Sequence, residues 1–355
     1  MSGKIITIVG ARPQFVKAAA VSRALAKFSD IQEILVHTGQ HFDTGMSEVF
    51  FDELDIPSPA YNLGISGGTH GSMTARMLAG LEQLMQENKV GAVLIYGDTN
   101  STLAGALAAS KLHIPIAHVE AGLRSYNRRM PEEINRVLSD HLSSLLFCPS
   151  SNAVENLKKE GIQKGVIHVG DVMYDSTLFA IEKAKARSNI LMHLNLEDEV
   201  FALATVHRAE NTGDRKVLSG ILDYLREQAA GTRLVMPLHP RTKAAVSSFG
   251  LSLEGIDVIE PVGYLDMTSL LQEASNVFTD SGGLQKEAYF HGKPCVTLRT
   301  ETEWVETIQH GWNRLWTVSD YLPRSSISEY GNGDAAERIV ECMVNFLSTR
   351  ANQQP

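Results

Sequence analysis

Short apolar runs alternate with longer amphipathic segments along almost the whole chain. In the first half, the apolar runs occupy residues 5–9, 33–37, 92–96, 115–119, 145–148 and 166–169. The segments between them place apolar residues three and four positions apart, which is the spacing of an amphipathic helix. These segments are residues 13–28, 69–88, 99–111, 131–142 and 151–160. Strands that alternate with helices in this way predict a parallel sheet with helices on both faces.

The alternation restarts after a helical stretch at residues 171–187 and a polar segment around residues 189–199. The second set of predicted strands is 201–205, 234–238, 258–259, 277–279, 295–298 and 315–318. The helices predicted with them are 214–229, 241–248, 266–274 and 284–291, and a last helix covers about 335–348. We therefore expect two α/β domains of similar size, which normally bind a ligand in the cleft between them.

The composition narrows the class of protein. The 355 residues are 43% hydrophobic and 21% charged, as in an ordinary globular protein with enough chain for two cores. The formal net charge of −9 argues against nucleic acid or anionic membrane as a partner. No apolar run approaches the roughly 18 residues that span a bilayer. The cysteines are widely spaced, so we expect no disulfide framework and no metal site, and we predict a cytoplasmic protein.

Charged residues are concentrated between residues 118 and 136, directly after the predicted strand at 115–119. This segment contains the carboxylates Glu120, Glu132 and Glu133 and the arginines Arg124, Arg128, Arg129 and Arg136. A strand followed by such residues places them at the carboxyl edge of a parallel sheet, where open α/β folds bind ligands. The alternative interpretation is a solvated loop before a helix, whose positive N-terminus attracts Glu132 and Glu133.

Asp98 follows another predicted strand, in the segment Tyr96-Gly-Asp-Thr-Asn-Ser-Thr102. Its carboxylate either caps the following helix or takes part in catalysis. Asp98, Glu120 and Glu132 all emerge at strand ends or helix starts of neighbouring elements. Converging carboxylates raise one another's pKa towards values that are useful for proton transfer. We therefore interpret these three as candidate acid and base groups.

Several cations also lie directly after predicted strands. Arg12 and Lys17 are near the start of the helix that follows the first strand, and a helix N-terminus favours phosphate. The alternative is a cation pair on the surface. In the second half, His207 and Arg208 follow one strand and His239 follows another. A single histidine in such a place is usually structural, but a protonated histidine also neutralises phosphate or acts as a general acid.

The segment Thr279-Asp-Ser-Gly-Gly-Leu-Gln-Lys-Glu-Ala288 passes from a predicted strand through a glycine turn into a helix. Ser281, Gly282 and Gly283 would present a hydroxyl and uncovered backbone N–H groups to a diphosphate. Glu287 lies about two turns into the helix and is a candidate for binding ribose hydroxyls. The alternatives are a tight turn without a ligand and a Glu287 that faces solvent.

These segments, spread from residue 10 to residue 306, together resemble the non-hydrolysing UDP-N-acetylglucosamine 2-epimerase family over nearly the whole chain. The resemblance implies two Rossmann-like domains of the glycosyltransferase-B and glycogen phosphorylase superfamily. We expect residues 1–170 to form the first domain and residues 171–334 to form the second, UDP-binding domain. The resemblance also implies that a C-terminal helix at about 335–355 packs back on the first domain, and that the protein is a homodimer.

The resemblance places ten residues at functional positions of the family, the last four of them around UDP. They are Arg12, Lys17, Asp98, Glu120, Glu132, His207, Ser281, Gly282, Gly283 and Glu287. Of these, we expect Asp98, Glu120, Glu132 and His207 to be catalytic. The further candidates for binding the UDP-sugar are Arg124, Arg128, Arg129, Arg136, Arg208 and His239. No metal and no cofactor is expected.

Some residues depart from the family's usual pattern. Gln14 stands where a Glu is usual, and His70 stands where many bacterial members carry a Gln that holds a second, allosteric UDP-N-acetylglucosamine. With Thr302-Glu-Trp-Val-Glu306, these departures resemble the subgroup that acts on UDP-2,3-diacetamido-2,3-dideoxy-glucuronate in O-antigen synthesis. A uronate needs a cation that a neutral sugar does not, and Arg128 and Arg129 are the candidates.

The expected reaction has a chemical difficulty, because the proton at C2 of a sugar is not next to a carbonyl. Oxidation by NAD would acidify this proton, but the turn at Gly10 lacks the glycines of a dinucleotide fingerprint. Anti elimination of UDP from C1 gives a 2-acetamidoglucal instead, and re-addition of UDP completes the inversion. The alternatives are UDP-N-acetylglucosamine as the substrate, a hydrolysing epimerase, a retaining UDP-sugar glycosyltransferase of the same fold, and a nucleotide-sugar sensor.

Overall fold

A computed structural model of the chain describes residues 3–40 and 52–351. The chain divides into two compact units: unit 1 comprises residues 1–176 and 328–355, and unit 2 comprises residues 177–327. The domain boundaries expected from the sequence are at 170 and 334. In the structure, unit 2 begins at residue 177, inside the helix predicted at 171–187, and ends at residue 327.

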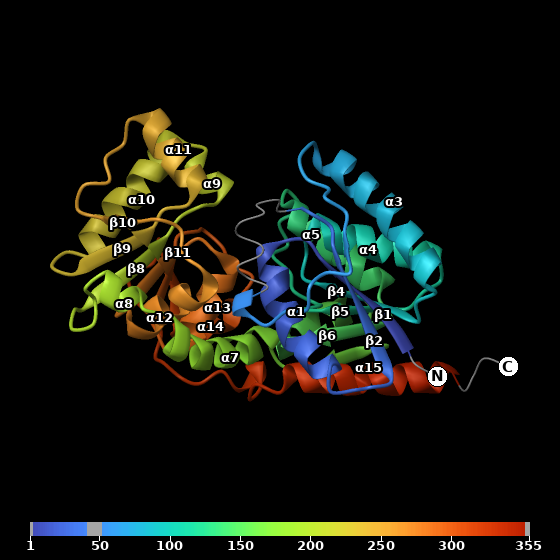
Figure 1. Cartoon of the computed structure of the whole chain (residues 1–355). Coiled ribbons are helices and arrows are strands. Elements are labelled where there is room, and N and C mark those ends of the chain that lie inside the picture. The colour runs from blue at the N-terminus through green and yellow to red at the C-terminus, as the bar shows by residue number, and fades with distance from the viewer. Residues whose placement is uncertain (1–2, 41–51, 352–355) are drawn as a thin grey trace. The chain divides into compact units, whose positions relative to one another are not determined.

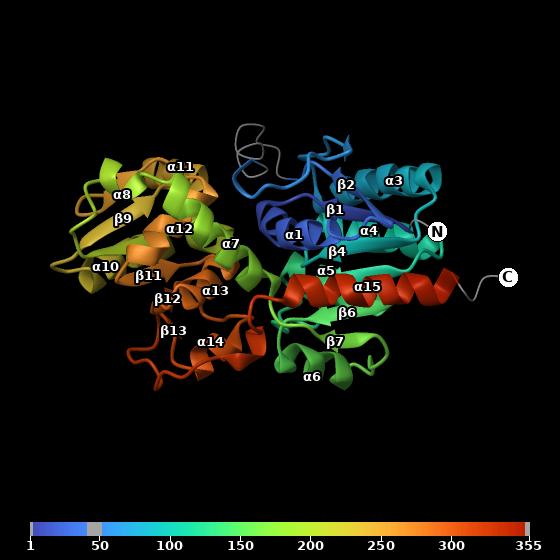
Figure 2. The same ribbon diagram turned by 60° about the horizontal axis from the view of Figure 1, so that its bottom comes forward.

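Unit 1 contains a seven-stranded parallel sheet with the order β3-β2-β1-β4-β5-β6-β7 (Figure 1). Its strands are β1 (Gly3–Val9), β2 (Ile31–His37), β3 (Tyr61–Asn62), β4 (Ala92–Tyr96), β5 (Ile116–Val119), β6 (Leu145–Cys148) and β7 (Val166–His168). Its helices are α1 (Arg12–Leu25), α3 (His70–Asn88), α4 (Asn100–Lys111), α5 (Pro131–Leu142), α6 (Ser151–Lys159), η1 (Ser328–Tyr330) and α15 (Ala335–Ala351). In Figure 2, α15 runs along this unit, and it contacts α1. Helix α7 (Val172–Arg187) carries the chain from unit 1 into unit 2.

The central strands of unit 1 are buried on both faces. Alternate residues of a strand point to opposite faces of the sheet. Ile6 and Ile8 of β1 pack with Val93 and Ile95 of β4 and with Met77 of α3, in one fully buried cluster. The residues that alternate with Ile6 and Ile8 are buried as well, in the second half of β1. Each fully buried aliphatic side chain contributes about 2 kcal/mol through the hydrophobic effect, so the apolar runs of the sequence become central strands.

Unit 2 contains a six-stranded parallel sheet with the order β10-β9-β8-β11-β12-β13. Its strands are β8 (Phe201–Thr205), β9 (Arg233–Pro237), β10 (Asp257–Ile259), β11 (Asn276–Thr279), β12 (Cys295–Thr297) and β13 (Asn313–Leu315). Its helices are α8 (Ile190–His193), α9 (Ala209–Thr212), α10 (Arg215–Gln228), α11 (Pro240–Phe249), α12 (Tyr264–Glu273), α13 (Gly282–Phe290) and α14 (Val305–Gln309). The predicted fold class, with two Rossmann-like α/β sheets, is confirmed.

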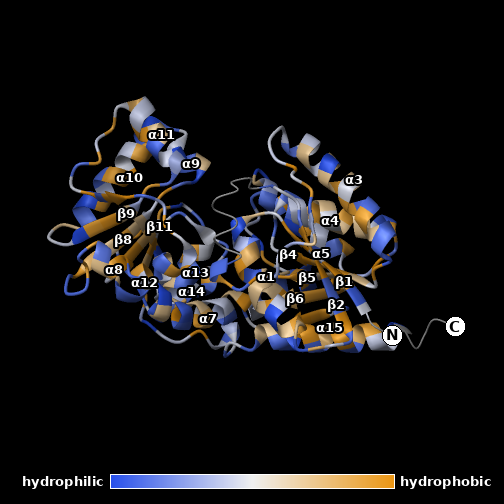
Figure 3. Ribbon diagram, in the orientation of Figure 1, coloured by the Kyte–Doolittle hydropathy of each residue, from blue (hydrophilic) through white to orange (hydrophobic). Residues whose placement is uncertain are grey.

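The core of unit 2 follows the alternation of β8. Ala202 and Ala204 belong to a buried cluster that includes the apolar face of α10. Phe201 and Leu203 belong to a second cluster, which includes Leu270 of α12. Figure 3 shows the strands of both sheets as mainly hydrophobic and the surrounding helices as mixed.

The last strand differs from its prediction. The apolar pattern predicts residues 315–318, whereas β13 comprises Asn313–Leu315. Asn313 is only 1% exposed, and its side-chain amide donates to Thr297 Oγ1 of β12 at 2.7 Å. A polar residue whose hydrogen bonds are satisfied inside the sheet is invisible to an apolar pattern, while Val318 is 47% exposed. The short elements β3, α8, α9 and α14 were not predicted.

Both sheets reverse their strand order at one point. In unit 1 the reversal lies between β1 and β4, and in unit 2 it lies between β8 and β11. Sheets of this kind bind ligands outside the carboxyl ends of their strands at such a switch point. The residues after these four strands are therefore the first place to look for a site. Among residues 3–40 and 52–351, no helix is both long and apolar enough to cross a membrane.

Candidate active site

The carboxyl ends of β4 and β5 in unit 1 carry two ion-paired carboxylates. Glu120 follows β5 and forms an ion pair with Lys17 of α1, and both side chains are largely buried. Asp98 follows β4, and its Oδ2 lies 2.5 Å from Nη2 of Arg136 on α5. The Asp98 side chain is 30% exposed. The structure thus brings four of the predicted residues together as two ion pairs at the carboxyl edge of the sheet.

The backbone at this edge is strained. Glu120 has φ 68°, a left-handed conformation that costs a residue with a side chain roughly 1–3 kcal/mol. Gly97, which precedes Asp98, has φ 59°. A Cβ at position 97 would lie 3.2 Å from Glu120 Oε2 and 3.4 Å from Lys17 Nζ. Gly97 therefore leaves room for the ion pair, and strain of this kind concentrates at functional sites.

The two adjacent glutamates of α5 have different environments. Glu133 is buried, and its carboxylate accepts hydrogen bonds from the backbone N–H groups of Ser125 and Tyr126, both at 2.9 Å. It also lies 3.1 Å from Nη1 of Arg136. Glu132 is partly exposed in the first turn of α5. Glu133 therefore orders the loop before α5, and Glu132 is the more accessible carboxylate for a substrate.

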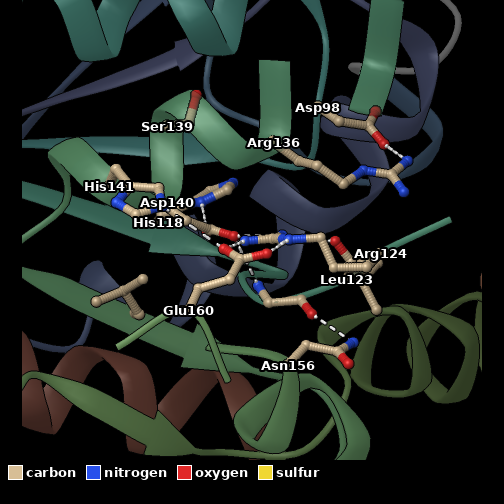
Figure 4. A network of polar contacts seen from close by, with 12 residues as sticks. Asp98, His118, Leu123, Arg124, Arg136, Ser139, Asp140, His141, Asn156 and Glu160 are labelled. Atoms are coloured by element: carbon tan, nitrogen blue, oxygen red, sulfur yellow. Dashed lines mark hydrogen bonds and ion pairs between the residues drawn. The ribbon is translucent and has the colours of Figure 1, made fainter. Parts of the chain in front are cut away.

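Arg124 belongs to a buried network of ion pairs and hydrogen bonds (Figure 4). Its guanidinium lies 2.7 Å from Asp140 Oδ2 and 2.7 Å from Glu160 Oε2. Burial opposes the charged form of Arg124, but the hydrogen bond to Glu160 and the charge of Asp140 outweigh burial and raise its pKa. The prediction that Arg124 binds substrate does not fit this geometry, because its side chain is 1% exposed and already paired with two carboxylates.

The other predicted cations of unit 1 lie in different places. Arg12 is the first residue of α1 and is partly buried. Arg128 and Arg129 are exposed in the loop that precedes α5. The backbone N–H of Arg129 donates to Asn127 Oδ1 at 3.1 Å, which shapes this loop. Both side chains are thus available to a ligand outside the carboxyl edge of the sheet.

In unit 2, a buried carboxylate lies at the switch point. Asp280 directly follows β11, is fully buried, and accepts backbone hydrogen bonds from His207 and Arg208, both at 2.9 Å. The side-chain amide of Asn211 donates to it at 3.0 Å. Nδ1 of His207 lies 3.4 Å from Asp280 Oδ1. Asp280 therefore orients His207 and joins the end of β8 to the end of β11.

The two histidines of unit 2 are close to each other. The ring centroids of His207 and His239 are 5.4 Å apart. Nδ1 of His239 accepts a hydrogen bond from the backbone N–H of Arg241 at 3.1 Å and so caps α11. The Arg241 guanidinium donates to the backbone carbonyl of His207 at 2.9 Å. The structure therefore brings these two predicted site residues together.

The glycine turn of unit 2 opens α13, as predicted. Ser281 is its N-cap, and Ser281 Oγ accepts from the backbone N–H of Leu284. A Cβ at Gly282 would lie 2.6 Å from Glu303 Oε1, so a larger residue there would displace the Glu303 carboxylate. Glu287, in contrast with the solvent-facing alternative, is buried, and its Oε1 accepts from the Tyr264 hydroxyl at 2.9 Å.

Three buried polar residues at these strand ends were not among the predicted site residues. Asp280 could have been found by its place directly after a strand, which it shares with Asp98. His118 interrupts the apolar run of β5. Gln14 accepts from the backbone N–H of Gly10 and donates to the carbonyl of Tyr96, both at 2.8 Å, and so ties β1 to β4. The sequence marks Gln14 only as a departure from the family's usual Glu and gives no indication of these contacts.

The arrangement suits proton transfer in unit 1 and anion binding in unit 2. Carboxylates paired with cations at a partly buried edge are suitable acids and bases. A helix N-terminus beside His207 and Arg208 is suited to a phosphate group. Within the described residues, no group of three or more His, Cys, Asp or Glu side chains is arranged to hold a metal ion.

Comparison with known proteins defines the family. Residues 23–344 match the family model described as UDP-N-acetylglucosamine 2-epimerase. The UDP-2,3-diacetamido-2,3-dideoxy-D-glucuronate 2-epimerase of Pseudomonas aeruginosa is 52% identical over 359 residues, which cover 97% of this chain and all of that protein. The UDP-N-acetylglucosamine 2-epimerase of Methanocaldococcus jannaschii is 42% identical over 364 residues, which cover 96% of this chain and 98% of that protein.

Comparison with solved structures leads to the same family. The crystal structure of the Methanocaldococcus jannaschii UDP-GlcNAc 2-epimerase in complex with UDP-GlcNAc and UDP has a TM-score of 0.88 at 41% identity. The match covers 97% of this chain and all of that chain. The enzyme from Neisseria meningitidis bound to UDP-GlcNAc has a TM-score of 0.87 at 29% identity, covering 96% of this chain and all of that one.

The chain belongs to the UDP-N-acetylglucosamine 2-epimerase family. The predicted family is thereby confirmed, and so is the predicted enzyme class, an isomerase that acts on UDP-sugars.

Proposed function

We propose that this protein inverts C2 of a UDP-2-acetamido sugar by anti elimination and re-addition of UDP. The observation that carries the proposal is the contrast between the two switch points. Unit 1 presents the ion-paired carboxylates Glu120 and Asp98, and unit 2 presents the N-terminus of α13 beside His207 and Arg208. Membership of the epimerase family supports the same reaction.

Unit 2 is the proposed binding site for the UDP moiety. The first turn of α13 has backbone N–H groups that carry partial positive charge, so it attracts a diphosphate. Arg208 and His207 add cationic or donor groups at the neighbouring strand end. Glu287 is held by Tyr264 and is the proposed acceptor for ribose hydroxyls.

The proposed reaction has two steps. In the first, the C1–O bond to UDP breaks and its electrons leave with UDP, while a carboxylate removes the proton from C2 and leaves a 2-acetamidoglucal. In the second, a carboxylic acid returns a proton to the opposite face of C2, and UDP re-forms its bond to C1. Asp98, Glu120 and Glu132 are the proposed base and acid. Arg12 and Lys17 are the proposed cations that stabilise the departing diphosphate.

We propose UDP-2,3-diacetamido-2,3-dideoxy-glucuronate as the substrate, converted from the gluco to the manno form. The similarity to the Pseudomonas aeruginosa enzyme of that name supports this choice. The proposed partners of the uronate carboxylate are Arg128 and Arg129, because both are exposed beside the carboxylate-bearing edge of unit 1.

Substitution of these arginines tests the choice of substrate. Arg128→Ala and Arg129→Ala, singly and together, should raise the KM for the uronate about tenfold, since charge-assisted hydrogen bonds contribute about 1.5–3 kcal/mol. The KM for UDP-N-acetylglucosamine should not change. Arg187→Ala, which removes another exposed arginine, is the control. An unchanged KM for the uronate in the double variant would contradict the assignment.

The second candidate function is epimerisation of UDP-N-acetylglucosamine to UDP-N-acetylmannosamine. The similarity to the Methanocaldococcus jannaschii enzyme favours it. The two candidates share one mechanism, so kcat/KM for the two substrates, measured side by side, decides between them.

The finer predictions concern the enzyme's setting. We propose a homodimer in the cytoplasm whose product supplies O-antigen or a related polysaccharide. Light scattering of the active enzyme in solution tests the dimer, and a monomeric mass at working concentration would contradict it.

A further inference from the structure

A buried histidine reaches from β5 to the turn that holds Asp98. Nε2 of His118 lies 2.7 Å from the carbonyl oxygen of Gly97, the residue before Asp98. Nδ1 lies 2.7 Å from Asp140 Oδ1, and both side chains are 0% exposed. A carbonyl oxygen can only accept a hydrogen bond, so Nε2 of His118 donates to Gly97, and the ring links this turn to the Asp140 carboxylate.

Asp140 is ionised in this network. Burial opposes its charged form, but the hydrogen bond from His118 and the charges of His118 and Arg124 outweigh burial and lower the pKa of Asp140. Its second oxygen, Oδ2, accepts from Arg124 Nη1 at 2.7 Å and from the backbone N–H of Gly122 at 3.1 Å. Gly122 is two residues after Glu120. One carboxylate therefore anchors the backbone beside both Asp98 and Glu120.

The network is continuous. Figure 4 shows His118, Asp140, Arg124 and Glu160 as one connected group. Asp140 contacts both His118 and Arg124, and Arg124 contacts Glu160, each at 2.7 Å. The hydrogen bonds to Gly97 and Gly122 are the points at which the network holds the backbone beside Asp98 and Glu120.

The backbone that this network holds includes three residues with positive φ after the neighbouring strands β4 and β5, of which Glu120 carries a side chain and is therefore strained. Gly97, Glu120 and Gly122 have φ angles of 59°, 68° and 85°. Strained residues persist only where their surroundings over-determine the conformation. A Cβ at Gly122 would lie 2.4 Å from the carbonyl oxygen of Ala153, so α6 packs directly against this turn.

We propose that His118 and Asp140 are positioning residues that fix Asp98 and Glu120 for proton transfer at C2. The inference rests on the proposed function, but the placement of the backbone can be measured without it. Displacing a catalytic group by about 1 Å costs on the order of 100-fold in rate. Loss of either residue should therefore lower kcat about 100-fold and leave the KM for the UDP-sugar within about twofold.

The experiment compares His118→Gln, Asp140→Asn and the double variant with a matched control, Glu160→Gln. The control removes a charge from the same network at its far end, next to Arg124 and away from the Gly97 carbonyl. Substitutions of residues that belong to one hydrogen-bond network have non-additive effects. The double variant should therefore lose no more kcat than the more impaired single variant, and Glu160→Gln should keep kcat within about twofold of wild type.

Amide hydrogen exchange supplies a reading that is independent of turnover. Segments containing Asp98 and Gly122 should lose protection in His118→Gln and Asp140→Asn and keep it in Glu160→Gln. Additive losses of kcat, an equal loss in the control, or unchanged protection in His118→Gln would overturn the proposal. A wild-type enzyme that epimerises no UDP-sugar would instead overturn the proposed function, and the exchange data would still test the positioning. Should Asp140→Asn fail to fold, His118→Gln with its exchange data decides alone.

Discussion

The two sheets reverse strand order in the same way, yet their switch points carry opposite chemistry. In unit 1 the carboxylates Asp98 and Glu120 lie at the strand ends, and each is paired with a cation. In unit 2 the buried carboxylate at the end of β11, Asp280, accepts hydrogen bonds from the backbone N–H groups of His207 and Arg208. The same topology thus carries ion-paired carboxylates in one unit and a helix N-terminus with neighbouring cationic side chains in the other, and we propose proton transfer at the first and anion binding at the second.

The backbone differs between the two sites as well. In unit 1, Gly97 and Glu120 have φ angles of 59° and 68°. In unit 2, Arg208 and Ser281 have ordinary φ angles of −68° and −74°. Strain accompanies groups that must be held in one geometry for chemistry. A helix N-terminus needs no such strain to bind phosphate. This difference is consistent with the proposed function, in which the chemical step takes place at unit 1 and UDP binds to unit 2.

The largest effect is expected from Glu120→Gln. This change removes the carboxylate that pairs with Lys17, and loss of a general acid or base lowers rates by about 100- to 10,000-fold. Affinity for UDP, measured by calorimetry, should stay within a few-fold of wild type, because the proposed UDP site is in unit 2. Glu155→Gln, at an exposed glutamate of α6, is the control. A variant that keeps kcat and loses UDP affinity would reverse the assignment of the two units.

Gly282→Ala should give the next largest effect, and on binding. The added Cβ would lie 2.6 Å from Glu303 Oε1, so either the Glu303 side chain, which is buried and paired with Arg299, or the first turn of α13 must shift. We expect UDP to bind at least tenfold more weakly. Gly220→Ala, in the middle of α10 where an added Cβ meets open space, should bind UDP like wild type. Equal UDP affinity in Gly282→Ala and wild type would remove the α13 turn from the proposed site.

The smallest effect on activity is expected at Asp175, a carboxylate of unit 1 that lies outside the proposed site. Burial raises the pKa of Asp175 to about 6. Because this pKa is above the unfolded value of about 3.9, the contribution of Asp175 to stability is full below about pH 4 and is lost as pH rises through 6. Asn keeps an oxygen for the Ala336 N–H, at 2.8 Å in the native protein.

Asp175→Asn should therefore be more stable than wild type at pH 8 by about 3 kcal/mol and equally stable at pH 4. Urea unfolding at the two pH values measures the difference. The variant should also keep kcat, because Asp175 lies on α7 and is not one of the residues of the proposed site. A stability difference that does not depend on pH would contradict the buried, titrating carboxyl.

Much of the fold could be predicted from the sequence, because parallel strands buried on both faces appear as apolar runs. The exceptions have local causes. The strand β3 has only two residues and α9 only four, too few to show a period. The strand β13 begins with the polar pair Asn313 and Arg314, which are both buried.

The candidate site was predictable in position more than in detail. Chemistry-bearing residues after strands identify the carboxyl edge, but their partners come from distant segments. Nothing in the sequence joins Lys17 to Glu120, which are 103 residues apart. Likewise, the ion pair between Arg124 and Glu160 depends on how α6, which ends just before Glu160, packs in unit 1. Choosing between Glu132 and Glu133 also required the structure, because the two are adjacent on one helix and only Glu133 is fully buried.

The central claim is that a proton is exchanged at C2 while UDP is eliminated and re-added. Proton NMR in deuterium oxide tests it most directly, with UDP-2,3-diacetamido-glucuronate and UDP-N-acetylglucosamine offered separately to the wild-type enzyme and to Glu120→Gln. We predict deuterium at C2 together with a manno product from the uronate, and neither from the Glu120→Gln variant. Epimerisation without deuterium at C2, or no exchange with either substrate, would contradict the account.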